Sequence, residues 1–133
     1  MHLKNKSETN IEGANLLIKN NYYAPSVHCS YYGVFQLLKS NINSFFGISY
    51  QDLRIEISKT KNVGTHKYVI DFYKSEIKHN FDLKTSQSFS RKMRDLKYFR
   101  EQSDYENVAI TKDDSDKAYE KAIDLIEMIN KIF

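Results

Sequence analysis

Apolar residues recur at helical spacing along most of the chain. The longest regular stripe runs toward the C-terminus and contains Ala118, Ala122, Leu125 and Ile129. Repeats of three and four residues place side chains on one face of an α-helix. Similar stripes predict five other helices, within residues 7–19, 25–45, 49–58, 69–77 and 88–105. The pattern therefore predicts an all-α fold, an up-and-down bundle of five or six helices.

Polar residues before these stripes indicate where helices begin. Ser49 and Thr111 are each followed three residues later by an aspartate, which is the spacing of a capping box. Pro25 suits a first helical turn, where its missing N–H costs nothing. Ser7 is predicted to cap the first helix, so that residues 1–6, which are mostly polar, would be frayed.

Composition agrees with a helical protein. The 133 residues include only four glycines and one proline, too few turn residues for a sheet of many strands. Hydrophobic residues make up 41%, and the length predicts a single domain over residues 1–133 with one core. Residues 59–82 are the exception, because Val69 and Ile70 also fit an extended segment.

Charge and cysteine content exclude several classes of function. The net charge of +3 is too small to indicate nucleic-acid binding by itself. Cys29 is the only cysteine, so no intramolecular disulfide is possible, and no Cys/His spacing resembles a zinc site. No segment approaches the roughly 20 apolar residues of a membrane span. We expect a cytoplasmic protein without a metal or cofactor and without a membrane partner.

Arg100 interrupts an otherwise apolar stripe. Phe89, Met93 and Leu96 precede it at helical spacing, and Asp104 follows it by four residues. A buried arginine is costly unless a partner or a cleft receives its charge. Two interpretations remain open: Arg100 forms a salt bridge with Asp104, or it lines a functional cleft at a dimer seam.

Two segments together resemble the HEPN family of small helical domains. SYYGVFQLLKS (30–40) resembles the family's tyrosine-rich segment, and DLKYFREQSDY (95–105) resembles its motif helix. The Ala-containing segment DKAYEKAIDLIEMI (116–129) follows at the family's spacing. The resemblance implies a helical bundle that forms a homodimer. It also implies a place in toxin–antitoxin or phage-defence modules, often beside a nucleotidyltransferase antitoxin, and many members are metal-independent RNA endonucleases.

The resemblance also implies which residues form the site. The family motif contains an arginine, a polar residue and a histidine four to six residues after the arginine. Arg100 matches the arginine and Glu101 stands at the polar position, but Tyr105 stands where a histidine would fall. We therefore expect RNA or a nucleotide to bind in a cleft around Arg100, with weak or no cleavage.

Three residues are candidates for catalysis. Arg100 suits a phosphorane, as a fixed fork of donors. Tyr105 is a poor base, because a phenol with a pKa of about 10 stays protonated at pH 7, but it could donate a hydrogen bond or stack on a base. His28 is the candidate replacement base, although a histidine beside apolar neighbours is more often packed or capping.

Further residues are candidates for binding RNA or a nucleotide. Arg94 and Lys97 could contact phosphates, although such clusters usually form a solvated face. Asp104 is placed in the same site, with a structural role at the helix end as the alternative. The remaining histidines, which we expect to be solvated, are His2, His66 and His79.

Overall fold

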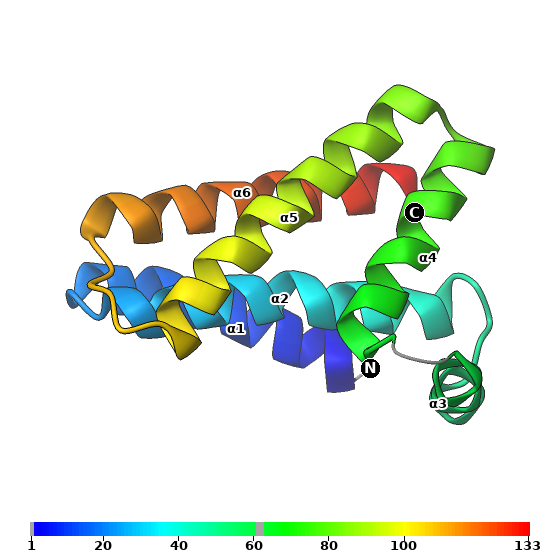
Figure 1. Cartoon of the computed structure of the whole chain (residues 1–133), viewed down its shortest axis with the longest axis horizontal. Coiled ribbons are helices and arrows are strands. Elements are labelled where there is room, and N and C mark those ends of the chain that lie inside the picture. Colours follow the sequence, from blue (N-terminus) through cyan, green and yellow to red (C-terminus); the bar gives the residue numbers. More distant parts are fainter. Residues whose placement is uncertain (1, 61–62) are drawn as a thin grey trace.

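The computed structural model describes residues 2–60 and 63–133. Over these ranges the chain forms six helices and no strand, which confirms the all-α prediction (Figure 1). The helices are α1 (His2–Lys19), α2 (Tyr23–Ser44), α3 (Tyr50–Lys59), α4 (Thr65–Asn80), α5 (Leu83–Tyr105) and α6 (Lys112–Ile132).

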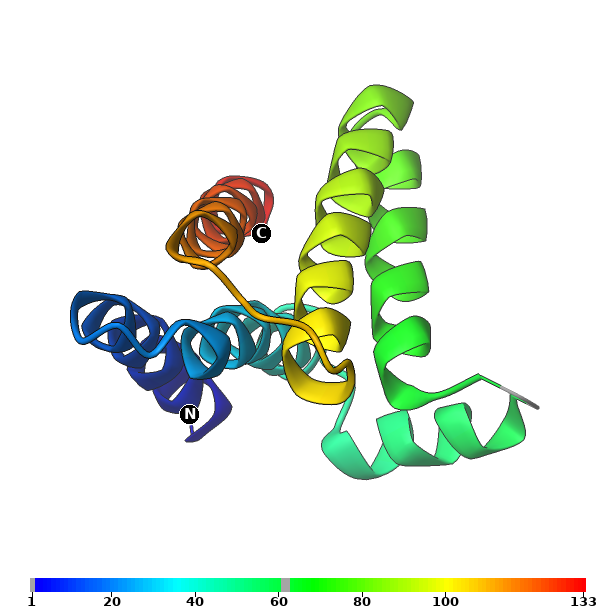
Figure 2. The ribbon, with the colours of Figure 1, turned by 60° about the vertical axis from the view of Figure 1, so that its left-hand side comes forward.

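Helix α2 is the element on which most of the bundle is assembled. α1 runs back along α2, and α6 packs against both of them (Figure 1). α4 and α5 form a second antiparallel pair that contacts α2, as the turned view shows (Figure 2). α3 lies at the edge of the molecule, between the end of α2 and the start of α4. The C-terminal end of α5 is thereby brought to the first half of α2.

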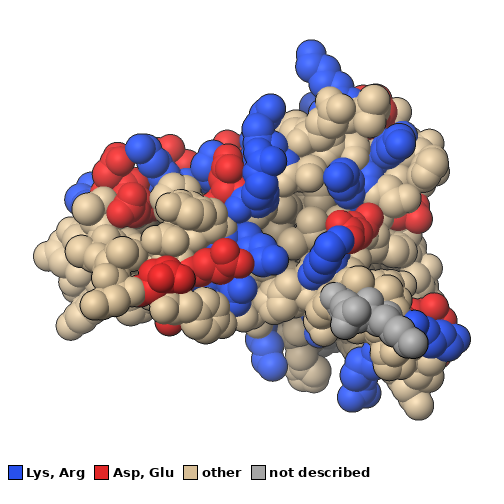
Figure 3. Space-filling view, viewed as in Figure 1, with Lys and Arg blue, Asp and Glu red and all other residues tan. Residues whose placement is uncertain are grey.

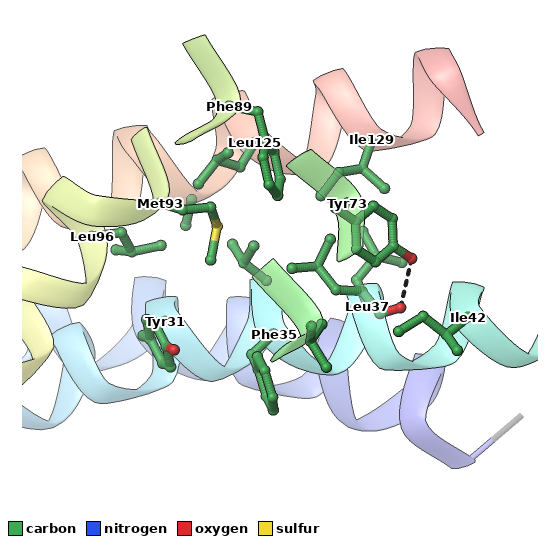
Figure 4. Packing of buried hydrophobic residues seen from close by; sticks show 14 of the residues in the cluster. Tyr31, Phe35, Leu37, Ile42, Tyr73, Phe89, Met93, Leu96, Leu125 and Ile129 are labelled. Atoms are coloured by element: carbon green, nitrogen blue, oxygen red, sulfur yellow. Dashed lines mark hydrogen bonds between the residues drawn. The ribbon is translucent and has the colours of Figure 1, made fainter. Parts of the chain in front are cut away.

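The predicted stripes form one hydrophobic core. Phe89, Met93 and Leu96 of α5 are fully buried and face α2 and α6 (Figure 4). The hydroxyl of Tyr73, which is also fully buried, donates a hydrogen bond of 2.6 Å to the carbonyl oxygen of Leu38. Burying apolar surface at about 25 cal/mol per Å² is the main force that holds these helices together.

Two predicted helix starts are confirmed and one is wrong. The hydroxyls of Ser49 and Thr111 accept hydrogen bonds from the backbone N–H groups three residues later. Ser7 caps nothing, because α1 already begins at His2 and residues 2–6 are helical. Ser7 is instead buried inside α1, where its hydroxyl donates to the carbonyl oxygen of Gly33 on α2.

The ambiguous segment 59–82 is helical over most of its length. α4 begins at Thr65 and buries Val69, Tyr73 and Ile77, a spacing of four residues that only a helix supports. The extended alternative for this segment is therefore wrong. α5 also begins earlier than its apolar stripe, at Leu83. None of the helices in the described ranges is long and apolar enough to cross a membrane.

Candidate functional site

Arg100 lies buried on α5 among the rings of tyrosines. Only 7% of the residue is exposed. Its guanidinium carbon lies 4.7 Å from the centroid of the Tyr31 ring and 5.9 Å from that of Tyr32. The ring of Tyr105, five residues further along the chain, lies 5.6 Å away. Contacts between an arginine and a ring face are attractive, and they stabilise the charge without neutralising it.

The hydrogen bonding of Arg100 is incomplete. One terminal nitrogen, Nη1, donates a bond of 3.3 Å to the Tyr32 hydroxyl, whereas Nε is buried without a partner. Across residues 2–60 and 63–133, no carboxylate lies within ion-pair distance of Arg100. The interpretation in which Arg100 forms a salt bridge with Asp104 is therefore wrong.

Asp104 pairs with a histidine on another helix. Its Oδ2 lies 2.9 Å from Nδ1 of His28, a residue of α2 that is 76 positions earlier in the chain. The next contact between the same two helices is the hydroxyl of Ser103, which donates to the carbonyl oxygen of Ala24 at 2.7 Å. The last turn of α5 is thus tied to the first turns of α2 by two side chains.

This pairing fixes the orientation of the His28 ring. A carboxylate only accepts hydrogen bonds, so Nδ1 of His28 carries the hydrogen. In the neutral ring, Nε2 is then the nitrogen without a hydrogen. The His28 side chain is 49% exposed, and it lines an open pocket of about 450 Å³ together with Asp104 and Cys29. Arg100 does not line that pocket, but Tyr32 contacts both residues, with its ring centroid 4.6 Å from that of His28.

His66 is not solvated, contrary to the sequence-based expectation. The residue lies half-buried at the start of α4, and its ring stacks on Phe35 with 4.2 Å between centroids. Its Nδ1 lies 2.7 Å from the Tyr31 hydroxyl. Burial, together with the positive charges of Arg100, Lys97 and Lys39, lowers the pKa of His66 to about 4. His66 is therefore neutral near pH 7.

The other predicted residues are distributed around this cluster. Lys97 is half-buried and lies 4.0 Å from Glu101, whereas Arg94 is exposed on the outer face of α5. Lys and Arg side chains gather along α5, with acidic side chains between them (Figure 3). His2 and His79 are exposed, as expected. The structure thus brings Arg100 and Tyr105 together, joins His28 to Asp104, and leaves Arg94 outside.

Sequence reasoning missed Tyr31, Tyr32 and His66 as members of the site. Tyr31 and Tyr32 were noted only as part of the tyrosine-rich segment 30–40, and His66 follows a loop with no local pattern. The family resemblance of residues 30–40 drew attention to α2 but not to what its tyrosines contact. Only the folded chain shows that Tyr31 lies against both Arg100 and His66.

The comparison with family models decides the family. The model of the HEPN domain matches residues 1–132. The chain belongs to the HEPN domain family. The six-helix bundle and the motif arginine of α5 agree with this assignment. At the level of the family, a HEPN domain indicates a toxin–antitoxin, defence or ribonuclease-like module. Searches of curated proteins and of solved structures found no match.

Proposed function

We propose that this HEPN domain is a component of a toxin–antitoxin or phage-defence module that binds a phosphate group of RNA or of a nucleotide at Arg100. One observation supports the proposal most strongly: the motif arginine is 93% buried without a neutralising carboxylate in the described structure, and its Nε has no partner. A buried charge of this kind is expensive to maintain unless it serves an anion.

The surroundings of Arg100 favour a phosphate over a carboxylate side chain. The guanidinium is a planar fork of donors that matches two phosphate oxygens. Lys97 and Lys39 add positive charge close enough to affect His66. The ring of Tyr105 covers the guanidinium but is 70% exposed, so we infer that it turns aside when a ligand enters. Its face also suits stacking on a base.

Binding of a short single-stranded RNA, followed by fluorescence anisotropy at several salt concentrations, tests this proposal. Arg100→Ala should weaken binding at least tenfold, and Arg100→Lys should restore only part of it, because an ammonium lacks the planar fork. Arg91→Ala is the matched control, since Arg91 is an exposed arginine of the same helix. Equal loss in Arg100→Ala and Arg91→Ala would reduce the interaction to general surface charge and refute the proposal.

The pair of His28 and Asp104 supports a second candidate function, metal-independent RNA cleavage. Nε2 of His28, held outward by Asp104, would take the proton of a ribose 2′-hydroxyl while Arg100 stabilises the phosphorane. The oxygen would attack phosphorus, and the 5′-oxygen would leave with a proton, which Tyr105 could donate. The products would be a 2′,3′-cyclic phosphate and a 5′-hydroxyl.

We also propose a homodimer and a nucleotidyltransferase partner, as the family resemblance implies. Support comes from the end of α5 and the loop after it, where Tyr98, Tyr105 and Val108 are each more than half exposed. Large apolar side chains gathered at one place are typical of an interface. Co-purification with a nucleotidyltransferase encoded beside this chain would test the second part of the proposal.

A further inference from the structure

The side chain of Tyr31 contacts both His66 and Arg100. The Tyr31 ring lies under the guanidinium at 4.7 Å, and its hydroxyl lies 2.7 Å from Nδ1 of His66. These residues come from α5, α2 and α4, so three helices converge at one point. His66 is the histidine that the fold places beside Tyr31, whereas His28 faces the neighbouring pocket. The family motif contains no residue of α4, so it does not predict this arrangement.

The hydrogen bond to Tyr31 determines which nitrogen of His66 carries the hydrogen. Tyr31 is fully buried, and within the described structure its hydroxyl has one hydrogen-bond partner, Nδ1 of His66. Burial raises the pKa of Tyr31, so the hydroxyl keeps its proton. A buried hydroxyl proton needs an acceptor, and Nδ1 is the acceptor at hand. The hydrogen of the neutral imidazole must then be on Nε2.

Within the described residues the hydrogen bond of His66 is made through Nδ1, so the Nε2–H group is left to donate to a ligand. The rings of Tyr31, Tyr32 and Phe35 pack against the imidazole. The charged groups near enough to lower its pKa are the cations Arg100 and Lys97 from α5 and Lys39 from α2. No carboxylate appears among them. The positive potential of these cations favours an anion as the acceptor for this N–H group.

We propose that His66 is a phosphate-contacting residue of this site, which donates a hydrogen bond from Nε2 to the same phosphate group that Arg100 binds. The inference rests on the proposed function and extends it from one residue to a site built by three helices. The role of Tyr31 is that of a positioning residue: it holds the imidazole in the donor tautomer. The phosphate group could be that of inorganic phosphate, of a mononucleotide or of RNA, and the experiment distinguishes these three sources.

Long-range ¹H–¹⁵N spectra of the histidine rings test the inference directly. Near pH 7 the free protein should show His66 as the Nε2–H tautomer. Addition of inorganic phosphate, AMP or a short single-stranded RNA should then shift the Nε2 resonance of His66, and the ligand that acts at the lowest concentration identifies the source. His79, exposed at the far end of α4, is the internal control and should not move.

Two substitutions distinguish the contribution of the Nε2 donor to binding from that of the aromatic ring. His66→Phe keeps an aromatic ring on Phe35 but removes Nε2, and it should weaken binding of the best of the three ligands about tenfold, the effect of one charge-assisted hydrogen bond. His66→Gln places an amide N–H near the position of Nε2 and should retain binding within about threefold. Because His66→Phe leaves the Tyr31 hydroxyl without its acceptor, the double variant Tyr31→Phe/His66→Phe verifies that the loss is not due to misfolding.

The outcomes distinguish this inference from the proposed function. If Arg100→Ala abolishes binding while His66→Phe binds normally, or if His66 is the Nδ1–H tautomer, the role of His66 is refuted and that of Arg100 stands. If the wild-type protein binds none of the three ligands, both are refuted.

Discussion

The carboxylate of Asp104 on α5 lies 2.9 Å from Nδ1 of His28 on α2, so its partner is on another helix. Four residues separate Asp104 from Arg100 on α5, yet the two do not pair, because the arginine points into a group of tyrosine rings. The charged groups of Arg100 and Asp104 consequently have different partners.

Arg100→Ala and Asp104→Ala should affect stability independently. Arg100→Ala removes contacts with aromatic rings and should lower the free energy of unfolding by about 1–2 kcal/mol. That is less than the 3–5 kcal/mol of a broken buried ion pair. In a double-mutant cycle by urea denaturation, the two effects should add within about 0.5 kcal/mol. A coupling energy well above that value would show that the two side chains interact after all.

His66 should make the protein less stable in mild acid. Its pKa is about 4 in the folded protein, below the ordinary value of about 6.5. Between these pH values the unfolded chain binds more protons, so the free energy of unfolding falls as pH falls from 6.5 to 4. The loss is at most about 3 kcal/mol, reduced by solvent where the ring is exposed. Denaturation of wild type and His66→Gln over this range measures it.

The comparison with the variant isolates this residue, because all other titratable side chains are the same in both proteins. We expect the curve of His66→Gln to be flatter between pH 6.5 and 4. Parallel curves would mean that the folded environment does not disfavour the protonated form of His66, and they would remove the argument for a neutral donor.

The sequence predicted those features that depend on neighbours along the chain. Met93 and Leu96 are buried because a periodic stripe needs only the local helix to place its residues on one side. Ser49 was recognised as a cap for the same reason. Ser7 carries an equivalent signal but lies within α1, where the carbonyl of Gly33, 26 residues away, satisfies its hydroxyl. A capping pattern, in which the hydroxyl accepts from a backbone N–H, cannot show that the same hydroxyl will donate to a distant carbonyl.

The site was predicted only in part, since its contacts join residues far apart in the chain. Arg100 stood out because it breaks an apolar stripe. His66 and Tyr31 are 35 residues apart, and nothing local to His66 indicates that a ring stacks on it. Asp104 illustrates the opposite error, because a residue four positions away suggested a pair that the fold does not form.

Gly33 should be intolerant of alanine, whereas Gly13 should accept it. A Cβ at Gly33 would lie 2.7 Å from Cγ1 of Ile11 on the neighbouring helix α1, but a Cβ at Gly13 meets nothing within 4 Å. Gly33→Ala should therefore cost about 1–3 kcal/mol through overpacking. Gly13→Ala should stabilise α1 by about 0.5–1 kcal/mol. Thermal denaturation of both variants checks the pair, and equal effects would contradict the close approach.

The assembly should be dimeric at micromolar concentration. The exposed side chains of Tyr98 and Val108 suit an interface that buries more than about 1,000 Å² in total. Multi-angle light scattering should give twice the mass of one chain, and Tyr98→Lys should shift the protein toward monomer. Lys78→Glu is the control, since that residue is exposed on α4. A wild-type protein that remains monomeric would refute the proposed dimer interface.

Cleavage of RNA in EDTA should be weak or undetectable. The motif helix α5 carries no histidine, and Tyr105, which replaces it, is a poor base at neutral pH. His28 is oriented by Asp104 as a base would be, but it faces a pocket that Arg100 does not line, so we expect the two residues to act poorly on one phosphate. Total RNA incubated with pure protein, followed by analysis of the new ends, measures the activity.

A specific set of results would reverse this expectation. Robust cleavage that leaves 2′,3′-cyclic phosphate ends would make the endoribonuclease the leading function. His28→Ala should then abolish cleavage, while Asp104→Asn should reduce the rate and alter its pH profile, because the amide no longer holds the imidazole as the carboxylate does. Tyr105→Phe would distinguish the hydroxyl from the ring. If cleavage survived His28→Ala but failed in Tyr105→Phe, the phenol itself would be the group that transfers the proton.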